Sequence, residues 1–398
     1  MKRRELPQRG VGVAATVQEA ADLVHGLPQG RMASSCAKEN DMAGSGPVGV
    51  AFVGCGNIAG PYADTMKKHP DRLRTVGAYD LNPEVGKAFA EKHGCRLYAS
   101  LDELLADQAA EMALNLTIHL AHAEVTQKLL RGGKHVHSEK PLAATREDAR
   151  ACVELAAEKG LLLSCSPFVI LGEAQQTLKK AVGDGVVGEV REVYAEMNWS
   201  RIEFWHPAPA PFYGRGAGPL FDVGCYPLSV LIQIFGSVAA VRAMGGVRLR
   251  ERTIASGPNA GQTFEATNPD HTCVLMEFTS GVHGRLTASF FAVKSAQAGI
   301  EVHGTAGSMR LDSVVGFNSR LDICRPGERE WSPMPLIGEP YPGVEWARGP
   351  LDVASALRNG TPLTCPGTAA LHVVDITLSA LEAGETGRTV KVESQFEG

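Results

Sequence analysis

The chain has 398 residues, of which 44% are hydrophobic and 21% charged, and its formal net charge is −5. These values are ordinary for a folded globular protein and argue against extensive disorder. The slight excess of acid gives no electrostatic reason to expect a nucleic-acid partner. No apolar run approaches the ~18–20 residues that span a bilayer, so we expect no membrane association.

The amino-terminal segment and the cysteines indicate the compartment. A basic cluster at residues 2–4 is not followed by an uninterrupted apolar stretch, so a secretory signal is not expected. The nine cysteines are an odd number and form no CxxC pair, which favours free thiols in a reducing compartment. We therefore expect a cytoplasmic protein without a metal site. Residues 1–46 are expected to be a disordered extension or an over-called start.

From residue 48, short apolar runs alternate with helical patterns. Strands are predicted at 48–53, 73–79, 112–117, 134–137 and 161–165, and helices at 58–68, 83–93, 119–131 and 145–160. Strands that alternate with helices indicate βαβ units and a doubly wound parallel sheet. We expect this Rossmann domain to cover residues 47–167.

A different pattern begins after about residue 167. A helix is predicted at 171–182, followed by strands at 189–199, 238–250, 271–279, 283–291 and 298–303, and by helices at about 347–359 and 367–381. Clustered strands with few helices between them favour a large open, mostly antiparallel sheet. The chain is thus predicted to be an α/β protein, with residues 168–398 forming a substrate-binding and oligomerisation domain.

A glycine turn follows the first predicted strand. Gly54 and Gly56 begin a G-x-G-x-x-A pattern that continues through Asn57 and Ile58 and opens a helix, as in a pyrophosphate-binding loop. Asp80 ends the second predicted strand, where a carboxylate binds the adenosine ribose hydroxyls and repels a 2′-phosphate. The pattern predicts NAD. NADP stays an open alternative because Arg72 or Arg74 could approach a phosphate.

Lys140 follows a predicted strand and is a candidate for the chemistry. The strand delivers Glu139 and Lys140 to its carboxyl end, the edge of an open α/β sheet that borders the ligand crevice. A lysine there can hydrogen-bond a substrate hydroxyl, and a bound oxidised nicotinamide would favour its neutral form. An ordinary solvated lysine is the alternative.

Four motifs together resemble the glucose–fructose oxidoreductase / inositol dehydrogenase (Gfo/Idh/MocA) family over roughly residues 47–392. They are the glycine turn at 54–59, the stretch from Thr117 through His122 to Val125, Glu139-Lys140-Pro141, and the segment from Gly216 to Tyr226. The resemblance implies a Rossmann domain joined to an open-sheet domain, and hydride transfer between nicotinamide and a sugar, polyol or related substrate. It also implies that Thr117, His122, Glu139 and Lys140 line the cofactor site.

The resemblance further implies roles for Lys140 and Asp222. Lys140 is expected to contact the substrate hydroxyl and the nicotinamide, and Asp222 to position the substrate. Many members of the family carry a catalytic histidine four residues after this aspartate, where this chain has Tyr226. A branch that resembles glucose–fructose oxidoreductase and dihydrodiol dehydrogenase also carries tyrosine there.

The spacing of Asp222 and Tyr226 is chemically reasonable in itself. Residues i and i+4 share one face of a helix, if a helix opens near Pro219. Our hypothesis is that Tyr226 is the acid/base, that Lys140 lowers its pKa and holds the reacting oxygen, and that Asp222 orients the substrate. A core tyrosine with a satisfied hydroxyl is the alternative.

The loop from Arg201 to Tyr213 is expected to face the substrate. Arg201, His206 and Tyr213 could bind sugar hydroxyls or an acid group, although packing at a domain interface is an equal alternative, and His206 could compete with Tyr226 as the acid/base.

Two other functions stay open at this level. One is a dihydrodiol-type dehydrogenase, and the other is a regulator that binds dinucleotide without turnover. The uncovered sheet is expected to self-associate, giving a homodimer or homotetramer.

Overall fold

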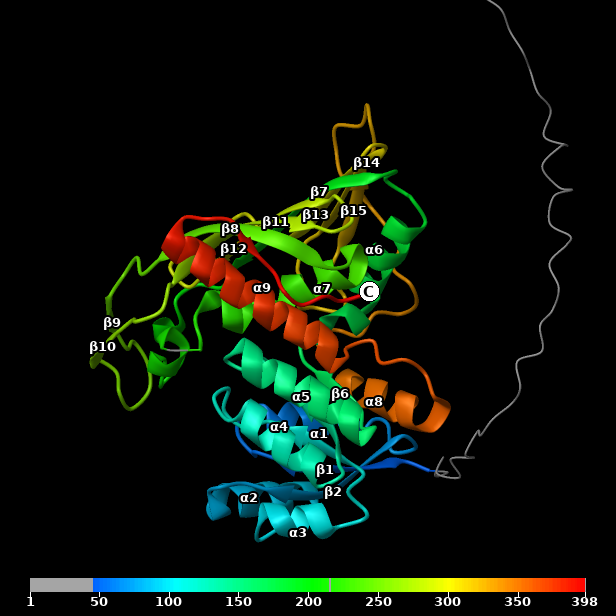
Figure 1. Cartoon of the computed structure of the whole chain (residues 1–398), viewed down its shortest axis with the longest axis vertical. Coiled ribbons are helices and arrows are strands. Elements are labelled where there is room, and N and C mark those ends of the chain that lie inside the picture. The colour runs from blue at the N-terminus through cyan, green and yellow to red at the C-terminus, as the bar shows by residue number, and fades with distance from the viewer. Residues whose placement is uncertain (1–45, 215, 398) are drawn as a thin grey trace, which may run out of the picture. The chain divides into compact units, whose positions relative to one another are not determined.

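The computed structural model describes residues 46–214 and 216–397 (Figure 1). The extension expected at residues 1–46 lies outside the described residues, except for Gly46. The described chain folds around two sheets, and helices pack on and between them.

The first sheet has six parallel strands in the described chain, in the order β3-β2-β1-β4-β5-β6. This order reverses direction between β1 and β4, as in dinucleotide-binding doubly wound folds. The strands are Val48–Val53 (β1), Leu73–Tyr79 (β2), Arg96–Leu97 (β3), Met112–Asn115 (β4), His135–Ser138 (β5) and Leu163–Cys165 (β6). Every residue of β1 is buried, which explains its unbroken apolar run.

The helices that flank this sheet begin and end at recognisable signals. They are Ala59–Met66 (α1), Pro83–His93 (α2), Leu101–Ala106 (α3), His122–Arg131 (α4) and Arg146–Lys159 (α5). Asn82 and Thr145 cap α2 and α5, and left-handed glycines, Gly94 and Gly160, end them. The doubly wound parallel sheet predicted from the sequence is confirmed, whereas the short α3 and β3 were not predicted.

The second sheet has nine strands in the described chain, in the order β16-β15-β14-β13-β7-β12-β11-β8-β17. Only the pair β7 and β12 is parallel among these strands, so the prediction of a mostly antiparallel sheet is confirmed. The strands are Val190–Asn198 (β7), Val238–Gly246 (β8), His271–Phe278 (β11), His283–Ser289 (β12), Gly299–Gly304 (β13), Gly307–Leu311 (β14), Leu321–Cys324 (β15), Ser332–Pro333 (β16) and Val390–Lys391 (β17).

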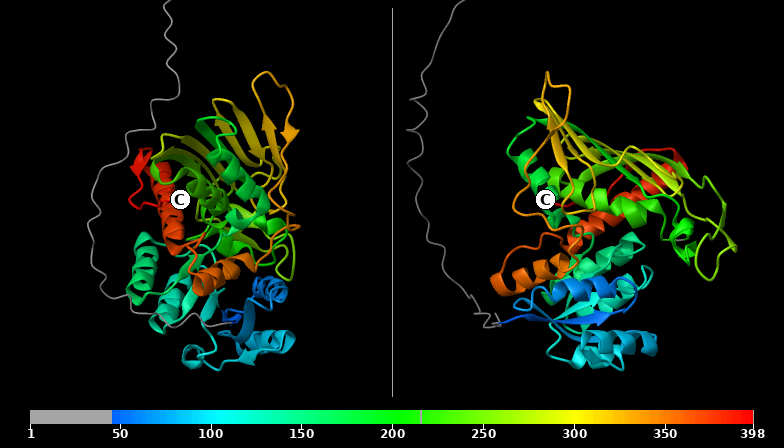
Figure 2. Two further views of the ribbon diagram at one scale, coloured as in Figure 1. Left: turned by 90° about the vertical axis from the view of Figure 1, so that its right-hand side faces the viewer. Right: turned by 180° about the vertical axis from the view of Figure 1, so that it is seen from behind.

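Helices cover one face of the second sheet. They are Glu173–Gly183 (α6), Cys225–Phe235 (α7) and Gly367–Thr386 (α9), and Figure 2 shows the opposite face without a helix of the described chain. In β11, buried and exposed residues alternate, as expected for a sheet with one covered face. A separate hairpin of Glu251–Thr253 (β9) and Thr263–Glu265 (β10) extends to one side in Figure 1.

The carboxyl-terminal helices return to the first sheet. Arg348–Asn359 (α8) contacts β2, β5 and β6, and α9 contacts α5 and β6. The Arg146 guanidinium donates to Asp375 at 2.6 Å, and Arg358 donates to both carboxylate oxygens of Glu111 at 2.8 and 2.9 Å. These ion pairs fasten α9 to α5, and α8 to the segment before β4.

Candidate active site

The glycine turn after β1 forms an open cradle. Gly54 has φ +89°, and a Cβ there would lie 2.7 Å from the carbonyl carbon of Leu116, so the turn packs tightly on the end of β4. A Cβ on Gly56 would meet nothing within 4 Å, and Asn57 beside it is exposed. No side chain caps the start of α1, which follows Ile58. Open backbone in front of an uncapped helix fits a pyrophosphate group.

Asp80 is joined to this turn. Its carboxylate accepts hydrogen bonds from the backbone N–H of Cys55 at 2.7 Å and of Asn82 at 2.8 Å. Arg72 precedes β2, whereas Asp80 follows it, and the Arg72 guanidinium donates to Ser355 and to the carbonyl oxygen of Leu351 on α8. Arg72 and the early β2 residue Arg74 therefore lie toward the end of the strand opposite to Asp80.

His122 is buried and does not face the cleft. Its Nδ1 lies 2.7 Å from the carbonyl oxygen of Pro141, and its Nε2 lies 2.9 Å from that of Thr117. Burial lowers the pKa of His122, so the neutral ring donates to one of these two carbonyls. The ring joins the segments that follow β4 and β5, and the cofactor-binding role predicted for His122 stays a prediction.

Glu139 is held from three sides. Its carboxylate accepts hydrogen bonds from the Tyr62 hydroxyl at 2.7 Å, from the Ser166 hydroxyl at 2.9 Å and from the Lys140 backbone N–H at 3.0 Å. His137 lies behind this group, and its burial lowers its pKa to about 3, so its ring is neutral. These contacts fix the backbone from which the Lys140 side chain projects.

Lys140 and Asp222 meet across the two sheets. The Lys140 Nζ donates to the Asp222 carboxylate at 2.5 Å and to its carbonyl oxygen at 2.7 Å. Asp222 lies in a π-helical turn, Leu220–Gly224, that leads directly into α7. The turn places the Tyr226 ring beside the same ammonium, with 5.5 Å between Lys140 Nζ and the ring centroid. The three residues predicted to act together are thus brought together.

The pKa shifts of Lys140 and Tyr226 differ from the expectation. Burial lowers the pKa of Lys140, but the neighbouring acidic groups, Asp222 first among them, together outweigh it and hold the group as an ammonium ion. Burial raises the pKa of Tyr226 above its usual value, and the opposing effect of Lys140 is smaller. Lys140 thus lowers the Tyr226 pKa, as hypothesised, but burial outweighs that effect, and Tyr226 is a neutral phenol.

The cleft in front of Lys140 has an empty volume of about 370 Å³. Its lining combines Lys140 and Asp222 with a largely apolar wall and one imidazole; the other lining residues are His119, Pro141, Pro211, Phe212, Gly216, Ala217 and Phe221. Sequence reasoning missed His119 and Phe221 as lining residues, whereas Phe212 belongs to the 201–213 loop that was expected to face the substrate. Phe221 directly precedes Asp222, and His119 lies two residues after Thr117. Their closeness in sequence to recognised motifs was the signal that could have identified them.

The three residues predicted to bind substrate have different locations. Tyr213 is fully buried, so the prediction that it faces the substrate is wrong. The Arg201 guanidinium lies against the rings of Phe204 and Phe291, at 5.6 and 5.1 Å from their centroids. The His206 ring lies 4.9 Å from that of Phe212, centroid to centroid, and so packs against the cleft wall.

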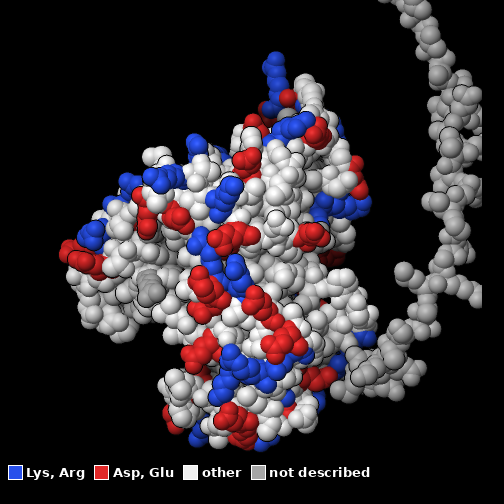
Figure 3. Space-filling model, in the orientation of Figure 1, with Lys and Arg blue, Asp and Glu red and all other residues white. Residues whose placement is uncertain are grey.

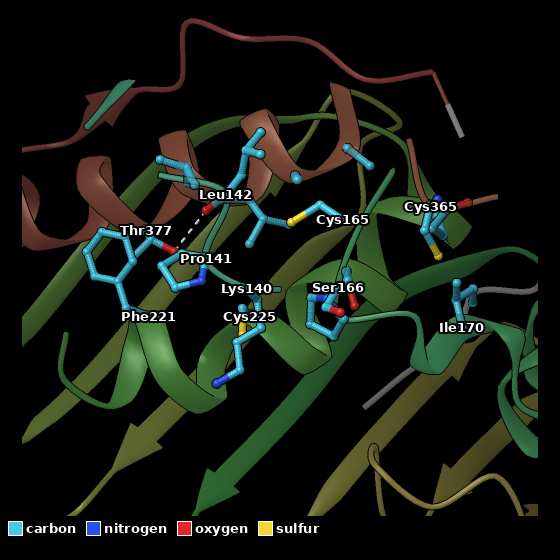
Figure 4. A pocket seen from close by; sticks show the side chains of 17 residues that line it. Lys140, Pro141, Leu142, Cys165, Ser166, Ile170, Phe221, Cys225, Cys365 and Thr377 are labelled. Carbon is cyan, nitrogen blue, oxygen red and sulfur yellow. Dashed lines mark hydrogen bonds between the residues drawn. The ribbon is translucent and has the colours of Figure 1, made fainter. Parts of the chain in front are cut away.

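A second cavity, with an empty volume of about 490 Å³, lies behind the Lys140–Leu142 segment (Figure 4). It is lined mainly by apolar side chains and by the thiols of Cys165, Cys225 and Cys365, whose pKa values burial raises. In Figure 4 the Lys140 amine points away from the other labelled side chains. Protonated, buried thiols are poor nucleophiles. No cluster of His, Cys, Asp and Glu in residues 46–214 and 216–397 is arranged to hold a metal ion.

Two family models match most of this architecture. Residues 48–166 match the model described as "Oxidoreductase family, NAD-binding Rossmann fold", and residues 175–310 match the "GFO/IDH/MocA C-terminal domain". The chain belongs to the Gfo/Idh/MocA oxidoreductase family. The resemblance predicted from the four motifs is thereby confirmed, and the chain is an NAD(P)-binding oxidoreductase.

Known members of the family show the range of related activities. The chain is 26% identical over 294 residues to a trans-1,2-dihydrobenzene-1,2-diol dehydrogenase of Mus musculus, covering 73% of this chain and 81% of that protein. It is 30% identical over 256 residues to a dTDP-3,4-didehydro-2,6-dideoxy-alpha-D-glucose 3-reductase of Streptomyces violaceoruber, covering 62% and 68%. A levoglucosan dehydrogenase solved with NADH and levoglucosan shares the fold, with a TM-score of 0.74, 18% identity, and coverage of 87% and 100%.

Proposed function

We propose that this oxidoreductase transfers hydride between NAD and a hydroxyl or keto carbon of a sugar, polyol or sugar derivative. The observation that carries the proposal is the convergence of Asp222 and Tyr226 on the Lys140 ammonium: Lys140 and Asp222 line the cleft, and the Tyr226 ring centroid lies 5.5 Å from Lys140 Nζ. That cleft borders the nucleotide loop, because His119 lines it and the neighbouring Thr117 packs against Gly54.

The catalytic roles that we propose follow from the protonation states of Tyr226 and Lys140. Tyr226, a neutral phenol, donates its proton to the substrate carbonyl oxygen as that carbon is reduced, and the Lys140 ammonium stabilises the resulting phenolate. Asp222 holds Lys140 in place and orients the substrate. The reverse reaction requires the phenolate to take the hydroxyl proton. When bound, the nicotinamide supplies or accepts the hydride and in its oxidised form adds positive charge nearby.

The apolar wall supports a substrate with one weakly polar face. Pro211, Phe212 and Phe221 offer rings that pack on the C–H face of a sugar or of a cyclic diol. A dihydrodiol dehydrogenase activity is the second candidate, and the similarity to the Mus musculus diol dehydrogenase favours it. Intact Lys140, Asp222 and Tyr226 argue against a regulator that binds nucleotide without turnover.

A substrate panel tests this proposal. Purified protein is incubated with NAD or NADP and with sugars, polyols, deoxy-sugars and a trans-dihydrodiol, and the nicotinamide absorbance is followed. We expect turnover with at least one compound of the panel. Tight NADH binding without turnover across the panel would instead favour the regulator.

Asp80 supports the choice of NAD over NADP. Its carboxylate lies at the end of β2, and Arg72 is bound to α8. We expect Asp80→Ala to weaken NADH binding by about tenfold, the loss of roughly 1.4 kcal/mol expected for a charged hydrogen bond. The same change is expected to weaken NADPH binding less, because it removes a repulsive charge. Nucleotide fluorescence titration measures both affinities; an unchanged ratio of the two would contradict the choice.

We also propose that the protein is a homodimer or homotetramer that assembles through the uncovered face of the second sheet. This face exposes apolar side chains among charged ones: Leu275 is 57% and Met244 79% exposed, Arg285 pairs with Leu275 on the neighbouring strand β12, and Tyr194 on β7 pairs with Arg285. An uncovered sheet of this composition is a common subunit interface.

Light scattering after size-exclusion chromatography tests the assembly. We expect a dimer or tetramer for the wild type and a shift to monomer for Leu275→Asp, because a charge is costly in a buried interface. Val293→Asp, a change at another exposed apolar residue outside the sheet, is the control. A monomeric wild type would contradict the proposal.

We propose that the protein is cytoplasmic, that its substrates are small molecules and that it has no nucleic-acid partner. Eight cysteines of the described chain are free thiols, as is usual in reducing compartments. Figure 3 shows acidic and basic side chains interspersed over the face formed by α4, α5 and α9. In the described ranges no helix has the length and apolar character to cross a membrane.

We assign cofactor binding to residues 47–167, and substrate binding and assembly to residues 168–398.

A further inference from the structure

A fully buried arginine lies behind the apolar wall of the cleft. Arg252, on β9, is 1% exposed. Its guanidinium binds the Glu203 carboxylate at 2.6 Å and also binds the Asp270 carboxylate, and it donates to the Tyr213 hydroxyl at 3.1 Å. We call these four residues the Arg252 cluster. They come from separate segments of the chain.

The polar groups of the Arg252 cluster are satisfied by one another and by backbone. The Tyr213 hydroxyl donates to Glu203 at 2.5 Å and accepts from the Ile202 N–H at 3.1 Å. The two oxygens of Asp270 accept from consecutive backbone N–H groups, those of residues 248 and 249. A buried set of charges adds little net stability, because desolvation offsets the attraction between them. Its effect is geometric, since a fully bonded network admits one arrangement of its segments.

The same segments hold the wall of the cleft. The Tyr213 carbonyl oxygen accepts from the N–H groups of Thr267 and Asn268, each at 3.0 Å. The Asn268 side chain in turn donates to the Ala217 carbonyl oxygen at 2.6 Å. Phe212 precedes Tyr213, and both Phe212 and Ala217 line the cleft. The wall is therefore fastened at both ends to the segment that supplies Asp270.

Backbone contacts also link the segment before Asp270 to the proposed catalytic residues. Gly218 has φ +91°, and a Cβ there would lie 3.0 Å from the Pro269 carbonyl oxygen, so the chain passes close to the segment before Asp270. The Gly218 carbonyl oxygen then accepts from the N–H of Asp222 at 2.9 Å. Backbone contacts from Pro269 to Gly218, and from Gly218 to Asp222, thus connect the Arg252 cluster to the residue that binds Lys140.

We infer that the Arg252 cluster is a positioning device that sets substrate affinity by fixing the cleft wall and the start of the Asp222 turn. The inference rests on the proposed function. It assigns Tyr213, expected from the sequence to touch the substrate, to the support of the residues that do. Because the cluster lies on the substrate side of the molecule and not in the first sheet, it acts on the substrate and leaves the nucleotide site alone.

The test compares two variants that each lose one tyrosine hydroxyl, the first in the Arg252 cluster and the second in the first domain. Tyr213→Phe removes the hydroxyl that links Glu203, Arg252 and the Ile202 backbone. Tyr98→Phe is the matched control, because Tyr98 is also buried and donates to a carboxylate, that of Asp107, but lies in the first domain. Glu203→Gln is a second variant of the cluster that retains the shape of the side chain.

For Tyr213→Phe and Glu203→Gln we expect the substrate KM to rise by about 10-fold to 100-fold, the usual cost of a small misplacement of binding groups. The value of kcat is expected to change less, because the two Lys140–Asp222 contacts are kept in both variants, and the NADH affinity is expected to stay as in the wild type and in Tyr98→Phe. An unchanged KM, a parallel loss of NADH binding, or the same rise in Tyr98→Phe would overturn the inference.

Amide hydrogen exchange gives a readout that does not depend on turnover. We expect the amides of residues 212–222 and 267–270 to exchange faster in Tyr213→Phe, with the first sheet unchanged, and exchange as in the wild type would overturn the inference. A wild-type protein that turns over no compound of the panel would refute the proposed function, whereas the exchange pattern would still report on the cluster.

Discussion

Tyr226→Phe is expected to lower kcat by about 10²- to 10⁴-fold, the range that a general acid contributes. The phenol is neutral because burial raises its pKa, and it lies beside the Lys140 ammonium, so it is the group that can deliver a proton to the reacting oxygen. Removing the hydroxyl alone leaves the ring and its packing in place. Steady-state rates in the direction of carbonyl reduction, with NADH affinity measured by fluorescence, check this.

Two further variants test whether the loss of activity is specific to the Tyr226 hydroxyl. Tyr62→Phe removes the hydroxyl that donates to Glu139 and is expected to lower the rate less, because that hydroxyl is already engaged by Glu139 and Ser166. His206→Gln tests the other acid/base candidate and is expected to keep most of the activity. A Tyr226→Phe enzyme with near wild-type turnover, or a His206→Gln enzyme without turnover, would move the proton donor away from Tyr226.

Lys140→Met is expected to lower kcat by about 10²- to 10³-fold, comparable with the loss of one donor that stabilises a developing negative charge. The ammonium is the cationic group of the described residues that line the cleft, and two contacts with Asp222 fix its position. Initial rates at saturating NADH and varied substrate measure the loss.

The Lys140 experiment needs a control for stability, because the single change leaves the Asp222 carboxylate half-buried and unpaired. The double variant Lys140→Met/Asp222→Asn removes that charge as well. We expect the double variant to regain thermal stability but not activity. Recovery of turnover in the double variant would show that Lys140 serves only to neutralise Asp222.

Much of the fold could be predicted because its signals are local in sequence. The apolar run of β1, the glycine turn and the capping residues of α2 and α5 each lie within a few positions of one another. The large sheet was predicted as mostly antiparallel, but the parallel pairing of β7 with β12 could not be, because the two strands are separated by about ninety residues and no local pattern encodes their register.

The candidate site shows the same division. Lys140, Asp222 and Tyr226 belong to short motifs, and the structure brings them together. Tyr213 was placed wrongly because burial is a property of distant segments: its hydroxyl is bonded to Glu203 and Arg252. The lowering effect of Lys140 on the Tyr226 pKa was predicted, but the larger opposing effect of burial was not, because burial depends on segments distant in sequence.

The central claim is that substrate chemistry takes place where Lys140 and Tyr226 face each other. A crystal structure of the complex with NADH and the best substrate of the panel tests it most directly. We predict that the reacting substrate oxygen lies within hydrogen-bond distance of the Tyr226 hydroxyl and the Lys140 ammonium, with the nicotinamide ring beside it. A substrate held elsewhere in the chain, with its reacting oxygen away from both groups, would contradict the account.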